Sequence, residues 1–135
     1  MGYNKSRNKE AVSLQPKDYS VGCICAIPKE LTAARAILDS IHTPLEAQPK
    51  HDENNWTLGS IGKHNVAITC LPEYGVVSAA VAAKSTQNTF PRLKFGLMIG
   101  VGGSIPSDGN DIRLGDIVVS LPTGEHGGVI QYDLG

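Results

Sequence analysis

The most constraining feature of the sequence is an uncharged run of eight residues, 20–27, that ends directly at a proline. A short and continuous apolar run is typical of a strand covered on both faces, as in a parallel or mixed sheet. Pro28 suits the first turn of a helix. Apolar side chains then recur at helical spacing, at Leu31, Ala34, Leu38 and Ile41. The sequence therefore predicts a strand, a tight turn and a helix, with order beginning near Tyr19.

Further elements follow along the chain. Residues 56–61 and 65–71 are strand-like, and the residues between them, 62–65, predict a hairpin turn. An Ala-rich helix is predicted over residues 78–88, capped by Ser78 and stopped by Pro91. Two more buried strands are predicted, at residues 95–100 and 117–120.

Composition and charge exclude several classes of protein. A net charge of -1 and a pI near 6.4 give no general electrostatic reason to bind nucleic acid or a membrane surface. No apolar run approaches the roughly 20 residues that span a bilayer. The three cysteines lie in strand-like apolar runs, which favours reduced thiols and an intracellular, cytoplasmic location.

The organisation of the chain predicts one domain behind a leader. Residues 1–17 carry four of the twelve basic residues against one acid, and we predict a flexible leader over residues 1–18. Strands alternating with helices over residues 19–135 predict a layered α/β sandwich with a central parallel or mixed sheet. Ten of the fifteen glycines lie between residues 96 and 135, with no final helix to cover the last strands. We therefore expect a truncated domain, whose covering elements come from missing sequence or a partner.

Glu30 is the first candidate for chemistry. It stands at the third helical position after the first strand, on the side of an open α/β sheet where ligands usually bind. An acid in the first turn of a helix is also favoured by the helix dipole alone. The residue pattern by itself leaves both interpretations open.

The glycine-rich segment Gly100-Val-Gly-Gly103 is the second candidate, because bare backbone N–H groups can approach an anion closely. The segment fails the dinucleotide fingerprint, since Ile105 stands where the third glycine is required. The better interpretation is a strand exit against which another backbone or a sugar packs.

The remaining polar residues give weaker signals. Glu125, His126 and Asp133 are candidate acid–base groups near the end of the chain, but no group has metal-ligand spacing. Ser104 and Ser120 do not stand in a nucleophile elbow. The other histidines lie in polar connections and are predicted at the surface: His42, His51 and His64.

Four segments in order resemble one known family. They are residues 21–35 (VGCICAIPKELTAAR), 97–103 (LMIGVGG), 111–120 (DIRLGDIVVS) and 124–133 (GEHGGVIQYD). They resemble the purine and uridine phosphorylase superfamily, above all the phosphorylase-like domains at the front of fungal multidomain proteins. The resemblance covers residues 19–135 and implies a three-layer α/β sandwich that is longer than this chain. It also implies either further domains after this one or assembly into a homo-oligomer.

The resemblance implies a role for each candidate. Glu30 matches the acid that positions the attacking water in related nucleosidases. The segment that lines the ribose and nucleophile is matched by Gly100, Val101, Gly102 and Gly103, and the pocket wall by Gly75 and Ser78. Phosphate-using members have an arginine and a hydroxyl residue where this chain has Met98 and Val101, which favours hydrolysis over phosphorolysis. Lys29 or Arg35 could contact an anion in their place. No cofactor is implied, and phosphate would act only as a co-substrate.

Three functional hypotheses follow. The first is cleavage of the N-glycosidic bond of a purine nucleoside or nucleotide, with this chain inactive alone. Inactivity is expected because the resemblance assigns the ribose-binding glutamate and the leaving-group acid to sequence beyond residue 135. The second is a non-catalytic nucleoside-binding sensor domain of a larger protein. The third is a truncated product with no independent role.

Overall fold

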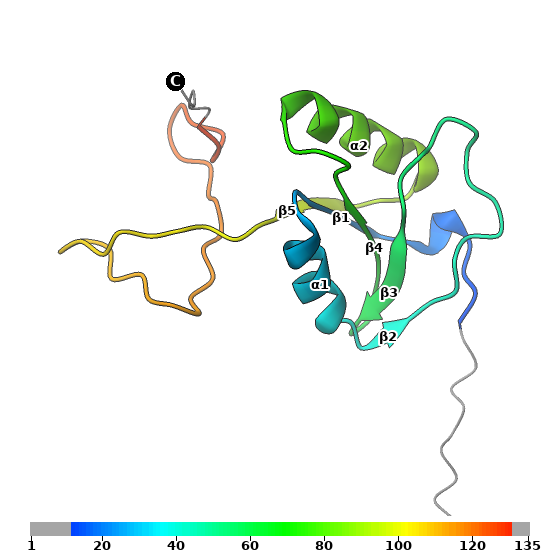
Figure 1. Cartoon of the computed structure of the whole chain (residues 1–135), viewed down its shortest axis with the longest axis horizontal. Coiled ribbons are helices and arrows are strands. Elements are labelled where there is room, and N and C mark those ends of the chain that lie inside the picture. The colour runs from blue at the N-terminus through cyan, green and yellow to red at the C-terminus, as the bar shows by residue number, and fades with distance from the viewer. Residues whose placement is uncertain (1–11, 131–135) are drawn as a thin grey trace, which may run out of the picture. The chain divides into compact units, whose positions relative to one another are not determined.

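The computed structural model describes residues 12–130 (Figure 1). The chain divides into two compact units, residues 1–101 and 102–135, and each is described by itself. Within residues 12–130, the helices and strands all lie in the first unit. In chain order these are a 3-10 helix η1 (Pro16–Asp18), β1 (Val21–Cys25), α1 (Pro28–Ala36), β2 (Ser40–Ile41), β3 (Thr57–Ile61), β4 (His64–Cys70), α2 (Val76–Thr89) and β5 (Phe95–Ile99).

The strands form one mixed five-stranded sheet in the order β2-β3-β4-β1-β5. The interior strand β1 is parallel to both of its neighbours, β4 and β5, whereas β3 is antiparallel to β2 and β4. The expected α/β fold with a central mixed sheet is therefore confirmed.

The two helices pack against alternate side chains of β1. Cys23 and Cys25 belong to the apolar cluster that contains Ala34 of α1. Ile24, between them, belongs to the cluster that contains Ala82 of α2. Because successive side chains of a strand point to opposite faces, α1 and α2 cover opposite faces of the sheet, as Figure 1 shows.

The predicted first strand and helix are observed with shorter bounds. The helix begins at Pro28 as predicted but ends at Ala36, so the predicted apolar periodicity extends too far. Leu38 packs against the core from the connection after the helix, and Ile41 lies in β2. The hairpin between β3 and β4 is confirmed, with Gly62 at a positive φ of 55° in the turn.

The start of α2 differs from the prediction. Its N-cap is Gly75 rather than Ser78, which lies within the first turn of the helix. Gly75 has φ 149°, a conformation that a residue with a side chain rarely adopts. The helix therefore begins directly after this glycine. The helix ends at Thr89, before Pro91, as predicted.

Strand β5 is more exposed than the predicted buried strand. It pairs only with β1 and forms one edge of the sheet. Phe95 is 58% exposed and Met98 is 65% exposed. A cavity of about 580 Å³ between β5 and α2 is lined largely by apolar groups. The prediction of full burial was wrong because the faces of β5 are incompletely covered, and its outer edge pairs with no strand within the described residues.

The second unit has no strand at residues 117–120, where one was predicted. Ile117, Val118 and Val119 are each at least 72% exposed. Isolated bridges, Ser107 with Asn110 and Thr123 with His126, close two turns instead. The apolar run finds no strand to pair with in the described part of this unit, and a strand requires a partner for its backbone groups.

The predicted leader falls partly outside the described residues, which begin at Val12. Val12 forms an isolated parallel bridge with His42, and η1 follows before the fully buried Tyr19. Regular structure thus begins before the predicted start at Tyr19. His42, predicted at the surface, is only 7% exposed because this segment covers it, and its Nδ1 lies 3.0 Å from the Tyr19 hydroxyl.

Candidate functional site

Glu30 closes the amino-terminal end of α1. It is the third residue of the helix and is buried, with 6% of its surface exposed. Its Oε2 accepts hydrogen bonds from the backbone N–H of Ala26 (2.8 Å) and of Ile27 (3.1 Å), the residue before the helix. This is the back-bonding half of a capping box, and Pro28 needs no partner because it has no N–H.

The other carboxylate oxygen of Glu30 reaches the chain after β5. Its Oε1 accepts a hydrogen bond from the N–H of Val101 at 3.0 Å. A Cβ placed on Gly100 would lie 3.4 Å from the same oxygen, so Gly100 passes close to the carboxylate. The structure therefore brings together Glu30 and the first two residues of the glycine-rich segment.

The electrostatics of Glu30 favour the ionised form. Burial acts to raise its pKa, but hydrogen bonds from Val101, Ile27 and Ala26 outweigh that effect and lower the pKa below its ordinary value. A carboxylate has about four lone-pair sites, of which three are occupied here. Glu30 can orient one further donor, such as a water molecule, but it is a weak base.

The cysteines beside Glu30 are free thiols with raised pKa values. Burial raises the pKa of Cys25 to about 11, with smaller contributions from Cys70 and Glu30. Burial and the charge of Glu30 also raise the pKa of Cys70. Since the thiolate is the nucleophile, these neutral thiols are not suited to nucleophilic chemistry.

A cleft of about 520 Å³ opens at the carboxyl ends of β1 and β4. The chain leaves β1 through α1 on one face toward β4, and leaves β4 through α2 on the other face toward β5. The cleft thus lies at the point where the strand order changes direction, which is where open α/β sheets bind ligands. It is lined by Pro28, Leu31, His51, Glu53, Asn54, Asn55, Cys70, Leu71, Pro72, Val77, Ser78, Val81, Ala82 and Ser85.

The predicted site residues divide between this cleft and its surroundings. Ser78 lines the cleft, whereas Gly75 only caps α2. Glu30 does not line the cleft, although Pro28 and Leu31, which lie before and after it in the sequence, do. Lys29 and Arg35 are exposed on α1.

The other candidates lie in the second unit or beyond the described residues. Gly102 and Gly103 begin the second unit and are exposed. His126 closes a turn with Thr123 there, beside Glu125, while Asp133 lies outside the described residues.

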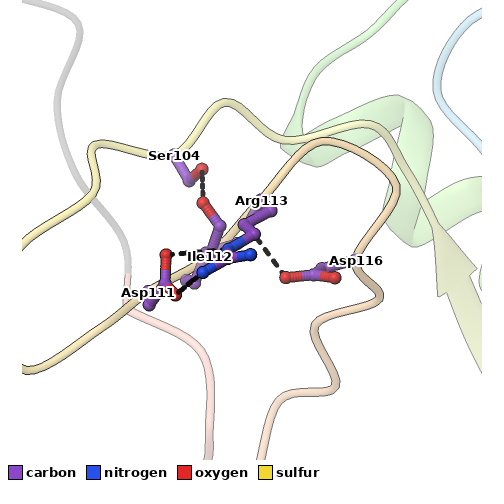
Figure 2. Close-up of polar contacts among 5 residues, drawn as sticks. All are labelled: Ser104, Asp111, Ile112, Arg113 and Asp116. Carbon is purple, nitrogen blue, oxygen red and sulfur yellow. Dashed lines mark hydrogen bonds and ion pairs between the residues drawn. The ribbon is translucent and has the colours of Figure 1, made fainter.

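The second unit contains a polar cluster that Figure 2 shows. The guanidinium of Arg113 pairs with Asp111 at 2.6 Å, and the backbone N–H of Arg113 donates to the Asp116 carboxylate at 2.8 Å. Ser104 donates to the carbonyl of Ile112 at 3.4 Å. Both charged groups of the ion pair are more than 60% exposed, at 76% and 66%, so the cluster stabilises a surface turn.

Sequence reasoning missed the wall of the cleft formed by residues 51–55. Asp52, within it, is half-buried and its carboxylate accepts four hydrogen bonds. They lower its pKa although burial acts to raise it. The available signal was local: an Asp side chain commonly accepts a hydrogen bond from the backbone N–H two residues further on and so stabilises a turn.

Over residues 12–130, no three acidic, histidine or cysteine side chains are grouped so as to hold a metal ion. None of the helices in that part of the chain combines the length and the apolar character needed to cross a bilayer.

The fold and the cleft define an α/β protein with a crevice at its topological switch point. A protein of Hyaloscypha variabilis named "Nucleotide-binding leucine-rich repeat (NLR)-like protein" is 68% identical over 123 residues, which are 91% of this chain. The chain spans 12% of that relative's length, which is consistent with a fungal multidomain protein. No protein-family model matches the chain. No solved structure matches it.

Proposed function

We propose that the chain is part of a nucleoside-binding sensor domain in a larger multidomain protein. In this proposal residues 19–135 belong to a three-layer α/β sandwich of the purine and uridine phosphorylase type, and further elements complete it. The ligand is a purine nucleoside or nucleotide, and the domain acts inside the cell. The name of the relative, which includes the words "nucleotide-binding", supports a binding domain rather than a metabolic enzyme.

The observation that carries the proposal is that the carboxylate of Glu30 is already held by hydrogen bonds within the protein. Three backbone N–H groups already bond its carboxylate, and its pKa lies below the ordinary value. A general base works best when its pKa is close to the working pH. A carboxylate in this state holds structure well and removes protons poorly, which favours binding over catalysis.

Hydrolysis of the N-glycosidic bond is the second candidate. The free lone pair of Glu30 can orient a water molecule, and its charge can stabilise the cationic ribosyl transition state. The resemblance also favours water over phosphate, because Met98 and Val101 are apolar and stand where phosphate-using members have an arginine and a hydroxyl. A phosphate dianion requires charged or hydroxyl partners, which these two side chains do not provide.

Calorimetry combined with product analysis separates the two functions. The chain, extended through the following sequence that completes the domain, is titrated with adenosine, guanosine, inosine and the corresponding nucleotides, and each mixture is then incubated for a day and analysed for free base. A sensor gives heat of binding and no base, whereas a hydrolase gives free base that Glu30→Gln abolishes. Glu46→Gln, at an exposed acid, is the matched control. Absence of binding to every compound would refute both functions.

A further inference from the structure

Asp52 joins the loop before β3 to the far end of α2. Its Oδ1 accepts from the backbone N–H of Asn54 at 3.0 Å and from the Asn54 side-chain amide at 2.6 Å. Its Oδ2 accepts from the indole N–H of Trp56 at 2.9 Å and from the hydroxyl of Thr89. Thr89, the last residue of α2, is 3% exposed, so the loop is anchored to a buried point.

The residues on both sides of Asp52 line the cleft, while Asp52 itself does not. The lining residues are His51, Glu53, Asn54 and Asn55. The amide of Gln48 braces the same loop by donating to the carbonyls of Asp52 at 2.6 Å and Asn54 at 2.9 Å. Four hydrogen bonds to the Asp52 carboxylate and two from the Gln48 amide thus hold these polar side chains at the cleft.

We propose that residues 51–55 are the specificity wall of the cleft and that Asp52 is the residue that positions this wall. The inference rests on the proposed function, because it takes the ligand to be a nucleoside. The amide, imidazole and carboxylate groups of the wall donate to and accept from the ligand's polar edge. The apolar side chains of Leu31, Leu71 and Val81 contact its body.

The charge of Asp52 is what suits it to this role. A carboxylate accepts all four hydrogen bonds, and bonds to a charged acceptor are roughly twice as strong as neutral ones. An asparagine at the same position has one acceptor oxygen and one donor NH₂, so two of the four donors would face another donor. Asp52→Asn therefore loosens the wall with almost no change in side-chain volume.

A ligand-free measurement tests the anchoring. Trp56 is the single tryptophan of the chain and bonds directly to Asp52, so its emission reports on the wall. Asp52→Asn is expected to shift Trp56 emission and to speed hydrogen exchange of the Asn54 amide by about tenfold. Asp39→Asn is the matched control, because Asp39 also bonds a backbone N–H, that of Gly62, in the hairpin. Unchanged emission and exchange in Asp52→Asn would overturn the positioning role.

A titration with adenosine tests the wall itself. Asp52→Asn and Asn55→Ala are each expected to raise the Kd for adenosine by about tenfold, and Asp39→Asn by less than about twofold. Thr89→Val removes one of the four bonds and keeps the carboxylate, so it serves if Asp52→Asn fails to fold, with an expected rise of about threefold. Normal binding by these wall variants would overturn the inference and leave the proposed function standing. Loss of nucleoside binding in the unmodified chain would refute the proposed function, and the inference with it.

Discussion

Glu30→Gln is expected to lower the free energy of unfolding by about 2–3 kcal/mol at neutral pH. The glutamine oxygen can replace Oε2 and keep the bonds from Ala26 and Ile27, but its NH₂ group then faces the N–H of Val101. One charge-assisted bond, worth about 1.5–3 kcal/mol, is lost, and two others weaken by up to about 1 kcal/mol each. The lower desolvation cost of the neutral amide offsets part of this loss. Because Val101 is 79% exposed and solvent screens that bond, the lower end of the range applies.

The pH dependence provides a second signature of the same interaction. The pKa of Glu30 is lower in the folded protein than in the unfolded chain, so its stabilisation is fully present above the unfolded value of about 4.3. It is lost as the pH falls through the lower folded pKa. The stability difference between the original chain and Glu30→Gln should therefore shrink below about pH 4.3.

Urea denaturation followed by Trp56 fluorescence measures both effects, at pH 7 and at pH values from 5 to 3. Glu46→Gln, at an exposed acid, controls for the loss of one negative charge. A change below about 0.5 kcal/mol at pH 7, the range typical of surface substitutions, would refute the reasoning. So would a difference between the two chains that stays constant as the pH falls.

Three further predictions concern other parts of the first unit. Burial lowers the pKa of His42, so its stabilising effect is complete above the unfolded value of about 6.5 and is lost as the pH falls through the folded pKa. Thermal melts from pH 8 to 5 should show this loss, and His42→Gln should reduce it. Gly59→Ala should cost about 1–3 kcal/mol, because the new Cβ would collide with the carbonyl oxygen of Ser40, while Gly96→Ala, with open space, should be nearly neutral in the same melts. Met98→Lys on the exposed edge strand should reduce any concentration-dependent association seen by light scattering, since charges protect sheet edges.

The elements that could be predicted from the sequence are those whose pattern is complete within a short window. The strand β1, the start of α1 at Pro28 and the β3–β4 hairpin each depend on a few consecutive residues. The burial of β5 and the expected strand at residues 117–120 depend on partners elsewhere in the chain, which apolar character alone does not supply. The cap of α2 was misassigned because a favourable residue type, Ser78, stood close to the glycine that makes the turn.

The same distinction applies to the candidate site. Glu30 could be identified because its position after β1 follows from the local pattern, and Gly100 and Val101 meet it because parallel strands end at the same edge of the sheet. The bond between Asp52 and Thr89 joins residues 37 positions apart, and the contact between Tyr19 and His42 joins residues 23 apart. Such contacts are set by packing of the whole unit, so short windows of sequence do not reveal them.

The bond between Glu30 and Val101 has a mechanical consequence. Val101 is the last residue of the first unit, and the covalent chain continues from it directly into the second. Tension applied to the chain beyond Val101 therefore acts on the Glu30 carboxylate and, through Ala26 and Ile27, on the turn that starts α1. Breaking this hydrogen bond would remove the direct link to the start of α1 and leave the pairing of β5 with β1 to carry the load.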